Sequence, residues 1–194
     1  MTELIFASHN HNKASEINNI IMPQFKVVTL DEIGLNEDIA ETADTLEGNA
    51  LIKARYVYQK TGKDCFADDT GLEVDALGGA PGVHTARYAG QDCNPEKNIQ
   101  KLLAALEGNA NRKARFKTIV AYIKDGEEFL FEGTVEGTIA THKAGNDGFG
   151  YDPIFIPDEG LGRTFAEMTL SEKNQISHRA RAIAKFVKHL MITE

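Results

Sequence analysis

The sequence predicts a mixed α/β protein on three observations. Short apolar runs typical of buried strands, such as Leu4–Ala7 and Cys65–Ala67, alternate with stretches in which apolar residues recur at helical spacing. Two strand-like runs enclose Asp125-Gly126, a dipeptide that favours a tight β-hairpin because both turn positions need positive φ. The chain closes with a long segment of helical periodicity, so we expect strand–helix units, one antiparallel hairpin and a final helix.

In the first half of the chain we expect three strands and two helices. Strands 4–7 and 26–30 enclose a helix that begins near Lys13 and ends before Pro23. Its apolar side carries Ala14, Ile17, Ile20 and Ile21. A second helix covers 45–61 and ends at Gly62. Its apolar side carries Leu46, Ala50, Ala54, Val57 and Tyr58. Strand 65–67 follows and ends in the polar run 68–71.

The second half begins with a glycine-rich loop at 78–82. Asn94 and Pro95 are typical of a helix start, and we expect that helix to end at Leu106, before Gly108. The hairpin strands cover 115–124 and 127–132. Residues 169–172 fit a capping box and open a C-terminal helix. We expect its core side to carry Ile176, Ala180, Ile183, Ala184, Val187 and Met191.

Length, charge and cysteine content restrict the class of protein. A chain of 194 residues is long enough for one sizeable domain, and a net charge of −8 opposes adhesion to nucleic acid or an anionic membrane. No apolar run approaches the ~20 residues of a membrane span, and no signal peptide is recognisable. Cys65 and Cys93 show no metal-ligand spacing, so we interpret both as reduced thiols. We expect a cytoplasmic protein without nucleic-acid or membrane partners.

The first polar stretch, SHNHNK at 8–13, leaves a strand and enters a helix. The unpaired N–H groups of a first helical turn favour phosphate, Ser8 and Asn10 add hydrogen bonds, and Lys13 adds a positive charge. Two other interpretations stay open at this point: a metal site on His9 and His11, or a capped polar turn. The stretch is not a Walker A loop, because its glycines are missing.

The second polar stretch, ADDTG at 67–71, places two adjacent carboxylates at a predicted strand end. Asp68 and Asp69 would suit magnesium, which prefers hard oxygen ligands, and one of them could instead orient or deprotonate a water. An Asp-rich turn is the alternative, whereas an aspartic protease would need a second Asp-Thr-Gly copy. Glu41 is a further metal candidate, and its neighbours Glu37 and Asp38 could serve as well.

Two further polar stretches carry aromatic and basic residues. At 147–153, glycine on either side of Phe149 would let a planar ligand stack on the ring, and Asp152 could accept hydrogen bonds. At 172–179, Lys173 and Ser177 share a helix face, and His178 and Arg179 follow. Taken singly, these stretches also fit an aromatic turn on a sheet edge and a solvated helix face. Together, the four stretches indicate a nucleotide site.

The same residues resemble a known family. The stretches TLEGNALIKAR, FADDTGLEVDALGGAPGVHTARYAG, GFGYDPIF and TFAEMTLSEKNQISHRARA are similar to those of the inosine/xanthosine triphosphate pyrophosphatases. The resemblance runs from about residue 4 to about residue 186 with the motifs in the same order. It implies one domain over 1–194 made of two α/β lobes, with a long mixed sheet flanked by helices and a central nucleotide-binding cleft. It also implies a homodimer that uses Mg²⁺ to convert ITP, dITP and XTP to the monophosphate and pyrophosphate.

The resemblance also implies roles for individual residues. Asp69 corresponds to the catalytic carboxylate and a magnesium ligand, with Asp68 beside it and Glu41 at the position of a metal-associated acid. The expected substrate-binding residues are Ser8, His9, Asn10, His11, Asn12, Lys13, Thr70, Phe149, Gly150, Tyr151, Asp152, Lys173, His178 and Arg179. The opening loop departs from the family pattern, because His9 stands where glycine is usual.

The expected chemistry is attack of water on the α-phosphorus, with Asp69 or the metal activating the water. Hypoxanthine and xanthine carry a carbonyl at C6, which Arg179 or a backbone N–H would satisfy, whereas the amino group of adenine would face a second donor. Two alternatives remain open from the sequence: a nucleotide sensor without turnover, and a pyrophosphatase for pyrimidine or methylated nucleotides.

Overall fold

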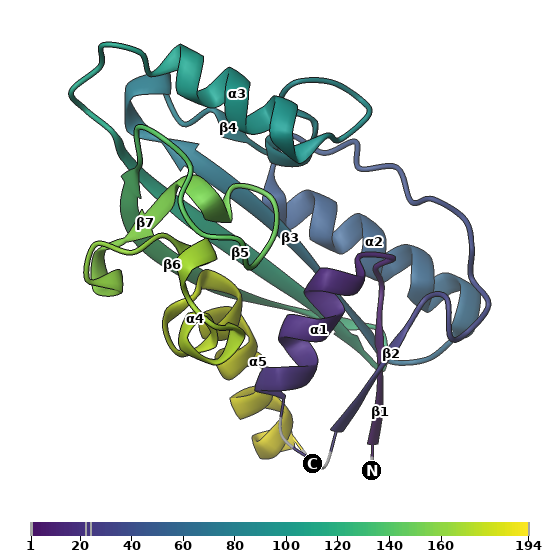
Figure 1. Cartoon of the computed structure of the whole chain (residues 1–194). Coiled ribbons are helices and arrows are strands. Elements are labelled where there is room, and N and C mark those ends of the chain that lie inside the picture. The colour runs from purple at the N-terminus through teal and green to yellow at the C-terminus, as the bar shows by residue number, and fades with distance from the viewer. Residues whose placement is uncertain (1, 22, 24, 194) are drawn as a thin grey trace. The chain divides into compact units, whose positions relative to one another are not determined.

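The computed structural model describes residues 2–21, 23 and 25–193 and has the predicted mixed α/β architecture (Figure 1). A seven-stranded sheet has the order β2-β1-β3-β5-β6-β7, with β4 beside β3. The strands are β1 (Thr2–Phe6), β2 (Phe25–Thr29), β3 (Cys65–Val74), β4 (Pro81–Gly82), β5 (Lys113–Lys124), β6 (Glu127–Ile139) and β7 (Phe155–Pro157). The α-helices are α1 (His11–Ile20), α2 (Leu46–Thr61), α3 (Pro95–Ala105), α4 (Leu170–Ile176) and α5 (His178–Thr193). The sheet is mixed, since β1 pairs with β2 and β3 in parallel and β6 pairs with β7 antiparallel.

The chain forms two compact units, each built from separate stretches of sequence. Unit 1 comprises Met1–Asp69, Thr118–Gly133 and Arg179–Glu194. Unit 2 comprises Thr70–Lys117 and Thr134–His178. The chain therefore passes from one unit to the other within β3, β5 and β6, and between His178 and Arg179. The organisation of residues 1–194 as one domain with a central cleft stays a prediction.

The core of unit 1 lies where helices α1 and α5 cover one face of its strands. Alternate residues of β1 point to opposite faces, and Leu4 and Phe6 face these two helices. The cluster also contains Ala14, Ile17, Phe25, Val27, Phe66, Val120, Tyr122, Ala182, Ile183, Phe186, Val187 and Leu190. Helix α2 covers the other face, where the Cys65 thiol donates to the carbonyl of Ala54 (3.2 Å).

The core of unit 2 is a second apolar cluster. Its buried members are Leu72, Val74, Ile99, Leu102, Leu106, Ala114, Phe116, Val135, Ile139, Tyr151, Ile154, Phe155, Phe165 and Met168. Helix α3 contributes Ile99 and Leu102, which are three residues apart and so share a helix face. The rings of Phe116 and Phe155 meet edge to face with centroids 4.7 Å apart, an arrangement that aromatic quadrupoles favour.

Local signals placed several element boundaries correctly. Thr45 accepts the Gly48 N–H at the start of α2, and Gly62 ends that helix in the left-handed region at φ 63°. Asn94 caps α3, with Pro95 at its first position. Asp125 and Gly126 have φ of 50° and 84°, so the hairpin between β5 and β6 is confirmed.

The expected end of strand 65–67 is wrong, because β3 continues from Cys65 through Val74. Asp68 and Asp69 therefore lie inside a strand rather than in a turn. Beyond Phe66, however, β3 has passed the end of its parallel neighbour β1, whose last pairing joins Phe6 to Phe66. The two carboxylates thus lie beside the loop that follows β1.

The single C-terminal helix is also corrected. The capping box at Thr169 is confirmed, but α4 ends at Ile176, and Ser177 is extended at φ −69° and ψ 155° before α5 begins. The buried stripe of α5 follows the helical period through Ala182, Ile183, Phe186, Val187 and Leu190. Ala184 and Met191 are therefore exposed rather than core residues. Among the described residues, no helix combines the length and apolarity that crossing a bilayer requires.

Candidate active site

The loop after β1 and the start of α1 form the predicted phosphate-binding stretch. The Ser8 hydroxyl accepts the Asn10 N–H (3.1 Å), and the Asn10 carboxamide accepts the Lys13 N–H (3.1 Å) as the N-cap of α1. The positive end of the helix dipole therefore lies at Asn10. Asn12 is exposed on the first turn of α1.

The two histidines of this loop both contact Asp31, which follows β2. His9 Nδ1 lies 2.8 Å from Asp31 Oδ1, and His11 Nε2 lies 3.3 Å from Asp31 Oδ2. His9 Nε2 also lies 3.3 Å from the carbonyl oxygen of Glu37. The hydrogen bond to Asp31 raises the pKa of His9, the Glu37 carbonyl and the charge of Asp38 add to this, and partial burial opposes it. His9 therefore connects the loop after β1 to the segment after β2 through these contacts.

A buried set of charged side chains gathers around β3 in unit 1. Lys13 Nζ donates to Asp68 Oδ1 at 2.8 Å, and Arg179 Nε donates to Asp68 Oδ2 at 3.0 Å. Arg179 also donates through Nη1 to Glu16 of α1. Arg179 is 1% exposed, Asp68 1% and Glu16 3%, so these three charges neutralise one another away from water, with the half-buried Lys13 beside them. Both carboxylate oxygens of Asp68 thus bind cations of the protein.

The electrostatics of Asp68 and Lys13 follow from this pairing. Burial alone would raise the pKa of Asp68, but the charges of Lys13, Arg179 and Lys53 outweigh burial and hold that pKa below its usual range. Burial lowers the pKa of Lys13, and Asp68 opposes the change. Asp68 therefore stays ionised and fixes the position of the Lys13 ammonium. That ammonium has three N–H donors, one of which forms this bond.

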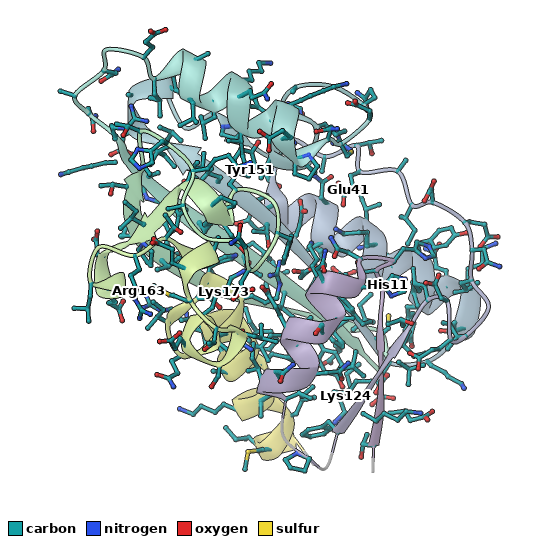
Figure 2. All side chains as sticks on the ribbon, in the orientation of Figure 1. His11, Glu41, Lys124, Tyr151, Arg163 and Lys173 are labelled. Carbon is teal, nitrogen blue, oxygen red and sulfur yellow. The ribbon has the colours of Figure 1, made fainter. Side chains whose placement is uncertain are left out.

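Asp69 belongs to a second pair of carboxylates that meet at Lys53 of α2. Lys53 Nζ lies 3.6 Å from Asp69 Oδ1 and donates to Glu41 Oε1 at 2.7 Å. Glu41, labelled in Figure 2, lies in the segment before α2. Burial raises the pKa of Asp69, Lys53 and Lys13 oppose this, and Glu41 and Asp68 add to it. The Glu37 carboxylate instead lies 3.6 Å from Lys60, so Glu41 is the acid of this segment that Lys53 joins to Asp69.

These two carboxylates fit a magnesium ion that a substrate would share. Residues 2–21, 23 and 25–193 hold no group of three or more His, Cys, Asp or Glu side chains arranged around one metal position. Magnesium, however, is commonly held by one or two carboxylates together with phosphate oxygens and water. Asp69 and Glu41 are hard oxygen donors that converge on one cation, Lys53.

A different set of site residues gathers in unit 2, around Lys173 of α4 (Figure 2). Lys173 Nζ donates to Asp152 Oδ2 at 2.6 Å and lies 4.9 Å from the ring centroid of Phe149 and 5.3 Å from that of Phe165. The same Asp152 oxygen accepts the Phe149 N–H at 2.9 Å. Lys173 and Asp152 are 2% and 3% exposed, whereas Phe149 is only half-buried. The half-buried ring of Phe149 thus lies next to the buried ion pair of Lys173 and Asp152.

The other predicted residues of unit 2 are His178, Tyr151, Gly150 and Thr70. His178 is 2% exposed and stacks on Phe116 with ring centroids 4.6 Å apart. Tyr151 is a core residue whose hydroxyl donates to the Thr85 carbonyl at 2.8 Å, and burial raises its pKa. Gly150 has φ of 60°, and Thr70 lies part-buried in β3.

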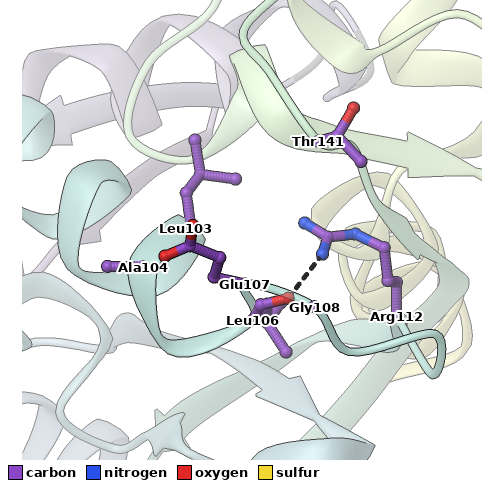
Figure 3. Close-up of a pocket in the computed structure, with 7 residues that line it drawn as sticks. All are labelled: Leu103, Ala104, Leu106, Glu107, Gly108, Arg112 and Thr141. Atoms are coloured by element: carbon purple, nitrogen blue, oxygen red, sulfur yellow. Dashed lines mark hydrogen bonds between the residues drawn. The ribbon is translucent and has the colours of Figure 1, made fainter.

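A pocket at the C-terminal end of α3 contains none of the predicted residues. It has a volume of about 400 Å³ and is lined by Leu103, Ala104, Leu106, Glu107, Gly108, Arg112 and Thr141 (Figure 3). Arg112 donates to the carbonyls of Leu106 (3.0 Å), Ile139 (2.7 Å) and Ala140 (2.7 Å). The first bond satisfies a carbonyl at the end of α3 and the other two lie at the end of β6, so Arg112 has a structural role in unit 2.

Sequence reasoning missed Lys53 and Glu16. Lys53 lies three residues after Ala50 and four before Val57, at a position where the apolar pattern of α2 would place a core residue. A lysine in such a position was the available signal. Glu16 is next to Ile17 on α1, and its burial depends on Arg179, which is distant in sequence. No local pattern identifies it.

Comparison with known proteins places these residues in a family. The Ham1 family model matches residues 4–189. A dITP/XTP pyrophosphatase of Porphyromonas gingivalis is 55% identical over 192 residues, 98% of each chain, and one of Flavobacterium johnsoniae is 50% identical over 99% of this chain and 100% of its own. The Ham1 protein structure from Staphylococcus aureus has a TM-score of 0.89 at 39% identity and covers all of both chains. The chain belongs to the Ham1 family.

Proposed function

We propose that this protein hydrolyses ITP, dITP and XTP to the nucleoside monophosphate and pyrophosphate, and so removes these nucleotides before they enter DNA or RNA. The enzyme is a nucleoside-triphosphate pyrophosphatase. The observation that carries the proposal is the placement of Asp69 and Glu41 on Lys53, with Lys13 held by the neighbouring Asp68. The family membership and the dITP/XTP pyrophosphatases of similar sequence support it.

The charged set of unit 1 would hold the triphosphate. Lys13 and the first-turn N–H groups of α1 would bind phosphate oxygens, because both present donors and positive potential. Asp69 and Glu41 would hold Mg²⁺, which supplies charge neutralisation of the phosphates when bound. Asp69 would also be the carboxylate that accepts a proton from the attacking water.

The aromatic set of unit 2 would hold the base. Phe149 would stack on the purine ring, and Lys173, close to that ring, would donate to a carbonyl at C6. Adenine carries an amino donor at C6, so it would leave the lysine ammonium facing a second donor. Arg179 is a weaker candidate for this contact, because its guanidinium pairs with two carboxylates, Asp68 and Glu16, whereas Lys173 lies beside the Phe149 ring.

The test is release of pyrophosphate from ITP, XTP, dITP, GTP, ATP and a pyrimidine triphosphate, with Mg²⁺ and with a chelator. We expect metal-dependent release from the first three and little from the others. Tight binding of ITP without release would indicate a sensor, and preference for the pyrimidine nucleotide would contradict the proposed substrate class. We further propose a cytoplasmic homodimer, and light scattering of the purified protein tests the dimer.

A further inference from the structure

The segment that contains Glu41 forms no helix or strand, yet the Glu41 carboxylate accepts a hydrogen bond from Lys53. Thr42 is exposed, and Glu41 and Ala43 are only half-buried. A segment of this kind needs contacts that fix its backbone if its carboxylate is to have a defined position. The first turn of α2 supplies two such contacts.

Asn49 supplies a hydrogen bond. Its side chain is completely buried, and its Oδ1 accepts the backbone N–H of Ala43 at 2.9 Å. Within the described part of the chain, Nδ2 of Asn49 is buried and has no hydrogen-bond partner. An unpaired buried N–H costs free energy, so an apolar side chain of similar size would suit a core position better. What asparagine adds at this position is the acceptor for Ala43.

Gly48 allows Ala43 to approach helix α2 closely. A Cβ at Gly48 would lie 2.6 Å from the Cβ of Ala43 and 3.1 Å from the Thr45 hydroxyl oxygen. Cβ atoms essentially never come within 3.0 Å of a non-bonded heavy atom, and the Ala43 Cβ cannot move without its backbone. Gly48 is the third residue of α2, where a capping box would have Glu or Gln. The glycine therefore lets Ala43 lie directly on the helix.

We propose that Gly48 and Asn49 are positioning residues, which hold the Glu41–Ala43 segment against α2 and so place the Glu41 carboxylate at the metal position beside Asp69. Lys53 lies one helical turn after Asn49 and so on the same face of α2. Asn49 therefore holds the backbone of this segment, while Lys53 holds its acid. The inference rests on the proposed function, since it assigns the segment to magnesium binding.

The first test measures Mn²⁺ binding to the nucleotide-free protein by electron paramagnetic resonance, together with thermal unfolding. We expect Asn49→Leu to leave the unfolding temperature near that of the wild type and to weaken Mn²⁺ binding about tenfold, as loss of a partner of a metal ligand commonly does. Val57→Ala, a core truncation two turns further along α2, is the matched control and should lower the unfolding temperature without changing Mn²⁺ binding. Unchanged Mn²⁺ binding by folded Asn49→Leu would overturn the inference.

The second test uses the contact between Gly48 and Ala43. Gly48→Ala should weaken Mn²⁺ binding, and the double variant Gly48→Ala/Ala43→Gly should restore it, because the second change removes the Cβ that the new methyl would meet. Ala43→Gly alone is the control for added backbone freedom. Failure of the double variant to regain Mn²⁺ binding would overturn the inference, and this comparison decides it if Asn49→Leu does not fold.

Turnover separates this inference from the proposed function. In the folded variants we expect a higher Mg²⁺ concentration at half-maximal ITP hydrolysis and an unchanged ratio of kcat/KM for ITP over ATP, because the base contacts belong to other residues. A wild-type protein that binds Mn²⁺ but does not hydrolyse ITP would refute the proposed function, while the Mn²⁺ comparisons would still decide the positioning role.

Discussion

Replacing Arg179 by methionine should unfold the protein at a much lower temperature. The guanidinium is 1% exposed and donates to Asp68 and Glu16, so methionine would remove one hydrogen-bonded cation from each of two buried carboxylates. Removing one partner of a buried ion pair costs about 3–5 kcal/mol. In a protein of this size, 1 kcal/mol corresponds to about 2–4 °C, so we expect a fall of between about 6 and about 20 °C.

The assay compares wild type, Arg179→Met and Arg179→Lys by urea and thermal unfolding, followed by ITP and ATP hydrolysis. Lysine keeps the charge but lacks the fork that reaches two carboxylates, so we expect an intermediate loss of about 1.5–3 kcal/mol, the value of one hydrogen bond to a charged group. If the free energy of unfolding of Arg179→Met is within about 1 kcal/mol of the wild-type value, the loss is below the range for a broken buried ion pair and the buried-pair reasoning is refuted. Loss of the preference for ITP over ATP in that stable variant would assign Arg179 to the base instead.

Two further predictions concern the loop after β1 and the turn at Phe149. Asp31 raises the pKa of His9, so the interaction between these two residues stabilises the fold. This stabilisation should be complete at a pH below the ordinary histidine pKa of about 6.5 and disappear as the pH rises through the pKa of His9 in the folded state. The difference in unfolding free energy between wild type and His9→Asn should therefore be constant below about pH 6.5 and shrink as the pH rises above that value, and a difference that does not change would contradict the assignment. Gly148→Ala should raise KM for ITP, since a Cβ there would overlap the Asp152 carboxylate that supports Lys173 and the Phe149 N–H. Gly150→Ala has a similar positive φ but open space around it, so it should lose about 1–2 kcal/mol of stability and raise KM less than Gly148→Ala does. Equal KM values in the two variants would argue against this role of Gly148.

Elements with local signals could be predicted from the sequence. The start of α2 at Thr45, the start of α3 at Asn94-Pro95 and the Asp125-Gly126 turn depend on contacts within a few residues, so a short stretch contains all the information needed. The adjacent carboxylates and the polar loop before α1 were likewise recognisable as chemistry-bearing residues. Their assignment to one family relied on motifs spread over most of the chain.

Features that depend on distant partners could not be predicted in this way. β3 continues through Asp68 because Lys13 and Arg179, far away in sequence, neutralise that carboxylate inside the protein. Lys53 is likewise separated in sequence from its partner Asp69, so the pair could not be predicted. The position of Lys53 in the apolar pattern of α2 indicated only that this lysine is buried. The break at Ser177 has no proline or glycine to mark it, so a continuous helical period concealed two separate helices.

The division of labour between the two residue sets is the central claim, and one kinetic comparison tests it most directly. Asp69→Asn and Phe149→Ala are each assayed for kcat and KM with ITP and with ATP. We expect Asp69→Asn to stay folded and to lose at least about a hundredfold in kcat on both nucleotides, since it removes the chemical group and leaves the base contacts. Phe149→Ala should keep kcat on ITP near that of the wild type and raise KM for both nucleotides, because it removes the stacking surface and leaves the Lys173 donor that distinguishes the C6 groups. Wild-type turnover by folded Asp69→Asn, or an unchanged KM in Phe149→Ala, would contradict this account.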